Sequence, residues 1–288
     1  MLVSKSVASA ALLGLALVVA VAGCGGADGT RKMRAEPDAN GVIACSSPLY
    51  ECDTVNVATL DCAAPVHLGS DGRVTDFSCR EWNAGAGKWC NAKGGYHGSI
   101  FGFKGSAPMD SNAQSVNTDD GSFRLALSVS QGSYAGGGLA FEAGCVDASA
   151  FTGIELAMSV ASGSIAGCTY QLQLQTFEQR PTSQNPSGGC DMQTTTCYRF
   201  PAATNLPALT DQPQVISIPF SSFTTSAPSM TPTPQEIVGL QWQVNSSTGA
   251  CTVELRIDDI RFIPAAAPPA DAGTPDDAAT ISDASSSS

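Results

Sequence analysis

The stretch FRLALSVS (residues 123–130) places a large apolar residue at every second position, with small or polar residues between them. An alternation with a period of two predicts a β-strand that buries one face. Similar runs recur between clusters of Gly, Pro and Ser, without a long amphipathic helical pattern between them. These runs cover residues 138–142, 154–160, 170–176, 215–220, 237–245 and 253–262. The sequence therefore predicts an all-β fold, specifically an antiparallel jelly-roll β-sandwich.

The cysteines indicate that this sandwich is cross-linked by disulfides. The chain has 11 cysteines; with Cys24 set aside as the lipidated residue argued below, five lie in residues 45–90 and five in residues 145–251. An even number in an exported chain is typical of disulfides, whereas zinc would require a ligand spacing that the sequence lacks. Because each half holds an odd number, at least one bridge must join the two halves.

Two disulfide pairs can be predicted from the positions of the cysteines. Cys190 and Cys197 bracket a short loop between two expected strands, so they are expected to pair with each other. Cys168 and Cys251 each come directly before a strand, so they are expected to bridge two strand starts.

The N-terminus has the pattern of a bacterial lipoprotein signal. Lys5 precedes an apolar segment that ends in VAGC (residues 21–24). A positive start, a short apolar centre and small residues at the cut are the parts of a cleaved signal peptide. A membrane-spanning helix is the alternative, but residues 4–22 are barely long enough to cross about 30 Å of hydrocarbon. We expect residues 1–23 to be removed and Cys24 to carry a lipid that anchors the chain at the outer membrane or cell surface.

The rest of the chain divides into a tether, a domain and a tail. Residues 24–44 are expected to form the tether, residues 45–264 one β-domain, and residues 265–288 a disordered acidic Ala, Pro and Ser tail that could not bury enough surface to fold. The formal net charge is -12. Nucleic acid is not an expected partner, because its phosphates require a basic surface.

The order of several segments resembles the galactose-binding-like β-sandwich of many carbohydrate-binding modules. The segments that carry this resemblance, between residues 72 and 263, include GGGLAF (136–141), VISIPFSSF (215–223) and the closing strand LRIDDIRF (255–262). The resemblance implies a possible structural calcium site between the first and last strands, at Asp76, Asp258 and Asp259. Family members often carry Glu after the first-strand Phe, whereas Ser78 follows Phe77 here. The alternative is a β-bulge at Asp258 and Asp259, with one side chain in solvent and the other accepting backbone hydrogen bonds.

Two expected strands carry rows of amide side chains. If these strands are neighbours, six amides share one face of a sheet, namely Gln171, Gln173, Gln175, Gln241, Gln243 and Asn245. Amides both donate and accept hydrogen bonds without a charge, which suits the hydroxyl groups of a polysaccharide. The alternative is that they are ordinary solvated residues on an exposed face. Trp242 is expected in the core, and Tyr198, Trp82 and Trp89 are expected to approach a surface.

The sequence gives little support to catalysis. No nucleophile elbow, phosphate-binding loop or histidine metal spacing is present, so no catalytic residue is assigned and the chain is not expected to be an enzyme. We interpret the chain as a surface lipoprotein that binds glycans. The alternatives are a structural or protein-interaction lipoprotein without a small ligand, or a carboxylate glycosidase or lyase, for which Glu142, Asp147 and Glu155 are the first candidates.

Overall fold

The computed structural model describes residues 60, 62–78, 80–91, 96–184, 186–193, 197–224 and 233–265. Cys24, the expected signal peptide, the tether at 24–44 and nearly all of the tail at 265–288 lie outside these residues, so the expected domain bounds stay predictions. No helix among the described residues is long and apolar enough to cross a membrane.

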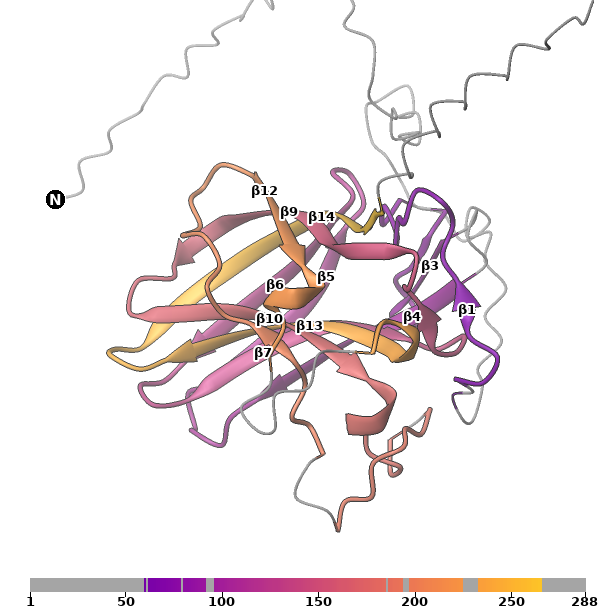
Figure 1. The fold of residues 1–288 in the computed structure, drawn as a ribbon. Coiled ribbons are helices and arrows are strands. Elements are labelled where there is room, and N and C mark those ends of the chain that lie inside the picture. Colours follow the sequence, from indigo (N-terminus) through magenta and orange to yellow (C-terminus); the bar gives the residue numbers. More distant parts are fainter. Residues whose placement is uncertain are drawn as a thin grey trace, which may run out of the picture. The chain divides into compact units, whose positions relative to one another are not determined.

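The fold is a sandwich of two β-sheets (Figure 1), which confirms the predicted fold class. One sheet has nine strands: β1 (Val66–His67), β2 (Trp82–Asn83), β3 (Lys88–Asn91), β4 (Tyr96–Lys104), β7 (Tyr134–Phe141), β8 (Val146–Asp147), β10 (Cys168–Thr176), β11 (Ala202–Ala203) and β13 (Ile237–Ser246). The other runs in the order β12 (Gln214–Pro219), β9 (Phe151–Ser164), β14 (Cys251–Pro264), β6 (Ser122–Val129) and β5 (Ser111–Asn117). Short 3₁₀ turns lie at η2 (Phe177–Gln179), η3 (Phe220–Ser222) and η4 (Pro234–Glu236). The named strands pair antiparallel except β1 with β8, which are parallel.

The hydrophobic core lies between the two sheets. The alternation in residues 123–130 forms β6, and its apolar residues Phe123, Leu125, Leu127 and Val129 are all buried, as predicted. Trp242 on β13 faces them from the other sheet, with its ring centroid 5.9 Å from that of Phe123. Burying such large side chains supplies most of the stabilisation of a sandwich.

Three disulfides have both of their cysteines among the described residues. Two of them connect segments far apart in the sequence, and one closes a short loop. Cys62 is joined to Cys145, Cys168 to Cys251 and Cys190 to Cys197; Cys90 is also disulfide-bonded. The first of these bridges joins the two cysteine-containing halves of the chain. The second ties β10 of the nine-stranded sheet to β14 of the five-stranded sheet, and the third closes a surface loop.

Candidate functional site

The six amide side chains lie on one face of the nine-stranded sheet. β10 and β13 are neighbours, with Gln171 opposite Gln243 and Gln173 opposite Gln241. The residues that alternate with these amides are buried between the sheets, and they include Leu172, Leu174, Leu240 and Trp242. The amides therefore occupy the outer face, which points away from the five-stranded sheet.

Three of these glutamines form a buried hydrogen-bonded ladder. Gln175 Nε2 donates to Gln241 Oε1 at 2.7 Å, and Gln241 Nε2 donates to Gln173 Oε1. Gln173, Gln175 and Gln241 are exposed by 9%, 6% and 7%. The alternative of freely solvated side chains is therefore wrong for these three, because mutual hydrogen bonds hold each in place.

The ladder leaves polar groups available on the same face. Within the described part of the chain, Gln173 Nε2 and Gln175 Oε1 have no hydrogen-bond partner, and Gln171, which is half-buried, has none for its side chain. Gln243 Nε2 donates to Asn245 Oδ1 at 2.6 Å, which leaves Gln243 Oε1 and Asn245 Nδ2 open. The face thus offers donors and acceptors. The side chains that already hydrogen-bond to one another lose little conformational entropy when a ligand binds them.

A row of aromatic rings, unforeseen from the sequence, flanks the amides. Phe101 and Phe103 on β4 stack with centroids 6.3 Å apart, and Tyr134 on β7 lies 6.4 Å from Phe103 and is 43% exposed. One row across four strands consists of Phe101, Gly138, Gln241 and Gln173, and the next of Phe103, Gly136, Gln243 and Gln171. Aromatic rings and amides are therefore separated by one strand of glycine.

Gly136 and Gly138 on β7 are at positions where no side chain fits. A Cβ at Gly136 would lie 2.3 Å from the carbonyl oxygen of Trp242 and 2.4 Å from the Phe103 ring. At Gly138 the nearest atom, the carbonyl oxygen of Leu240, would be 2.1 Å away. The glycines let β7 approach β13 closely, and the Phe103 ring and Gln241 occupy the space beside them.

Two tryptophans expected near a surface are in fact buried. Trp82 is 7% exposed and Trp89 is 0% exposed, because β2 and β3 extend the nine-stranded sheet and bury both rings against it. Trp89 packs edge-on against Phe141, with centroids 5.4 Å apart. Tyr198, in contrast, is half exposed.

The three carboxylates considered for catalysis lie in separate environments. At the end of the amide face, Glu142 pairs with Lys88 and accepts a hydrogen bond from Ser99 Oγ at 2.6 Å. Glu155, on β9 of the five-stranded sheet, has a pKa lowered by hydrogen bonds from Arg261 and Ser217. Burial raises the pKa of Asp147, but hydrogen bonds from Ser149 outweigh burial and lower it. The structure therefore does not bring these three groups together as an acid and base pair.

Two of the three carboxylates considered for calcium are paired with arginines. Arg73 Nη1 lies 2.9 Å from Asp76 Oδ2, and Arg256 Nη2 lies 3.2 Å from Asp258 Oδ2. The strand register shifts between Asp258 and Arg261, where Asp259 is exposed with φ 50° and its N–H donates to Asp258 Oδ1. This is the geometry of the bulge alternative. Among the described residues, no three His, Cys, Asp or Glu side chains are grouped so that they could hold a metal ion.

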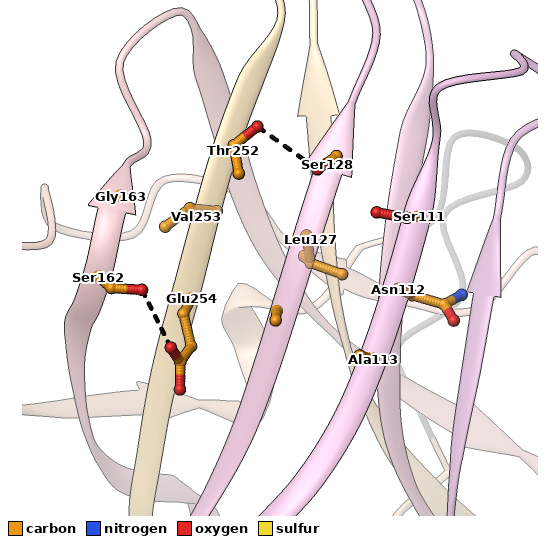
Figure 2. Close-up of a pocket in the computed structure, with 11 residues that line it drawn as sticks. Ser111, Asn112, Ala113, Leu127, Ser128, Ser162, Gly163, Thr252, Val253 and Glu254 are labelled. Atoms are coloured by element: carbon orange, nitrogen blue, oxygen red, sulfur yellow. Dashed lines mark hydrogen bonds between the residues drawn. The ribbon is translucent and has the colours of Figure 1, made fainter.

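The outer face of the five-stranded sheet carries a shallow depression of about 210 Å³ (Figure 2). Ser162 Oγ donates to Glu254 Oε2 at 3.0 Å, and the hydroxyls of Ser128 and Thr252 lie 3.4 Å apart. None of the 11 described residues that line it is aromatic. Four of its polar side chains contact one another in pairs, and it has no aromatic ring to pack against a sugar, unlike the face that carries the amides.

No protein-family model and no curated protein matches the sequence. Among solved structures, the chain is similar to the family 11 carbohydrate-binding module from Clostridium thermocellum in complex with a β-1,3-1,4-mixed-linked tetrasaccharide, with 11% identity and a TM-score of 0.39 over 58% of this chain and 89% of that one. It is also similar to SGBP-B from a complex xyloglucan utilization locus in Bacteroides uniformis, with 13% identity and a TM-score of 0.31 over 58% of this chain and 47% of that one.

Proposed function

We propose that the outer face of the nine-stranded sheet binds a neutral glycan chain without catalysis. The observation that carries this proposal is the repeated row of aromatic ring, glycine and amide across β4, β7, β13 and β10. Aromatic rings pack against the apolar faces of sugar rings, and the open amide groups suit their hydroxyls. The charges at the end of the face, Lys88 and Glu142, neutralise each other, so a charged sugar gains no free counter-ion there.

Calorimetry of the full chain tests this proposal, with Cys24→Ser included to keep the protein free of lipid. Soluble β-glucans, xylans and galactose-containing glycans serve as probes. We expect binding of at least one polymer in the micromolar to millimolar range, since each hydrogen bond to a neutral group contributes about 1 kcal/mol. No heat with any polymer would contradict the proposal and favour a structural or protein-interaction role.

Substitution of the two half-buried glutamines tests the amide face most directly. Replacing both Gln171 and Gln243 with alanine should weaken glycan binding about thirtyfold, because two hydrogen bonds of about 1 kcal/mol each are lost. Both side chains lie outside the buried ladder, so the thermal midpoint should change little. The matched control is Gln235→Ala, an exposed glutamine on η4. Wild-type affinity in the double variant would remove the amide face from the site.

We also propose that the chain is anchored through a lipid on Cys24, which rests on the signal pattern of residues 1–24. Many anchored copies on one surface would raise the effective affinity of a weak module for a polymer. In cells that process lipoproteins, Cys24→Ser should abolish recovery in the detergent phase, whereas Cys190→Ser with Cys197→Ser should be recovered there as the wild type is. Equal detergent recovery of the Cys24 variant would contradict the anchor.

A further inference from the structure

Tyr198 combines exposure with a backbone conformation that bulky residues rarely adopt. Its φ is 64°, in the left-handed region, and the residue is 49% exposed. A side chain with a Cβ is strained there, so the surrounding structure must impose the conformation. Backbone strain of this kind tends to persist where a side chain has a specific task, and an exposed tyrosine has no core packing to explain it.

Several contacts fix this tyrosine in place. The disulfide between Cys190 and Cys197 ends at the residue directly before it, with the two Cα atoms 5.6 Å apart. The Tyr198 N–H donates to the carbonyl oxygen of Gln179 at 2.9 Å, and Gln184 Nε2 donates to Tyr198 Oη at 3.3 Å. The ring also meets Phe200 edge-on, with centroids 6.3 Å apart.

The segment that carries Tyr198 borders the amide face. Ala202 on β11 lies opposite Gln173, and the carbonyl oxygen of Pro201 accepts a hydrogen bond from the Leu174 N–H at 2.9 Å. β11 and the residues before it therefore follow the edge of β10. In Figure 1 the segment between η2 and β11 extends from β10 on the side away from β9 and β14, which is the side of the amide face.

The order of the paired strands places the Tyr198 segment relative to the aromatic rings. β4 pairs with β7, β7 with β13, β13 with β10 and β10 with β11, so β11 lies at the opposite end of this order from Phe101 and Phe103. Tyr198 lies four residues before Ala202 of β11, so it belongs to the edge of the face opposite β4.

We propose that Tyr198 is a second aromatic contact for the glycan, and that the Cys190–Cys197 disulfide positions it. This inference rests on the proposed function and adds to it the length of the ligand. A glycan that reaches from Phe103 to Tyr198 must cross β7, β13 and β10, which at a spacing of about 4.8 Å per strand is a long extended chain rather than a single sugar. Tyr198 then contributes only to oligosaccharides long enough to reach it.

Titration of an oligosaccharide series from one sugar upward tests this inference. Tyr198→Ala should weaken binding of the longest oligosaccharides about tenfold and leave the shortest ones unchanged, whereas Tyr198→Phe should keep most of the affinity. Met192→Ala, an exposed side chain in the same loop, is the matched control and should bind as the wild type does. A purely structural role for Tyr198 would instead weaken short and long ligands alike, which would overturn the proposal.

The role of the disulfide is tested by combining substitutions. Cys190→Ser with Cys197→Ser should weaken long oligosaccharides as much as Tyr198→Ala does, and adding Tyr198→Ala to that variant should cause no further loss. Independent losses that multiply would overturn the positioning role. If Tyr198→Ala binds as the wild type does while Gln171→Ala with Gln243→Ala binds weakly, this inference fails and the proposed function stands. If the wild type binds no glycan, both fail.

Discussion

Replacing both Cys168 and Cys251 with serine is expected to lower the free energy of unfolding by about 4 kcal/mol. The bridge closes a loop with a sequence separation of 83, and its main effect is to restrict the unfolded chain. It also ties the two sheets together at the start of β10 and of β14. Urea denaturation at neutral pH, followed by tryptophan fluorescence, measures the loss.

The short bridge provides the matched comparison. Cys190 and Cys197 are only 7 residues apart, so their replacement by serine should cost about 2 kcal/mol and leave the fold intact. Similar losses for the two double variants would show that loop length does not control the contribution of these disulfides.

A comparable loss is expected when Arg73 is replaced with methionine. Glu81 is 3% exposed, and its carboxylate is held by both terminal nitrogens of Arg73, at 2.9 and 3.2 Å. Thr75 Oγ1 and the Asp76 N–H also donate to it, but neither carries a positive charge. Removing the arginine takes a two-nitrogen ion pair away from a buried carboxylate, and breaking a buried pair from one side typically costs about 3 to 5 kcal/mol.

The double variant Arg73→Met with Glu81→Gln separates charge from packing. It should recover much of the stability, because the buried carboxylate is then replaced by a neutral amide. Denaturation of the wild type, both single variants and the double variant at neutral pH gives the coupling energy. A loss below about 1 kcal/mol in Arg73→Met alone would contradict the account, since that is the range of an exposed pair.

Lowering the pH should weaken the same network of hydrogen bonds and ion pairs. Burial raises the pKa of Asp76, but hydrogen bonds from Ser78 and the charge of Arg73 outweigh it and lower the pKa. Because the folded pKa lies below the unfolded one, the stabilisation is complete at neutral pH and is lost as the pH falls through the folded value. Arg73→Met removes part of it, so its stability should depend less on pH in that range than that of the wild type.

The sequence predicted the parts of the fold that follow from strand periodicity. The alternation from Phe123 to Val129 placed one strand in the core, and the alternation around Leu172 and Trp242 placed six amides on a common face. Because the side-chain period of a strand is two, such patterns assign faces without knowledge of the partner strand.

The aromatic half of the site was not predictable because it inverts the usual pattern. In β4, the segment YHGSIFGFK, Phe101 and Phe103 point outward while Gly98 and Gly102 alternate with them. A reader who assigns large apolar residues to the core would place these rings inside. The pair of Arg73 and Glu81 was missed because residues outside the strands carry no periodicity that could bring them together. Trp82 and Trp89 were misplaced for the same reason: the short strands that bury them have no repeating pattern.

The order of strands also constrains how the polypeptide acquires its structure. β14 lies between β9 and β6, and β13 lies between β7 and β10, so the last two strands of the described residues are interior strands, one in each sheet. A nascent chain that ends before residue 237 lacks a central strand in each layer and cannot close either one. Such non-local pairing folds slowly, and here it has to wait for the C-terminal strands. Closure of both sheets therefore depends on the segment that carries β13 and β14, residues 237–264.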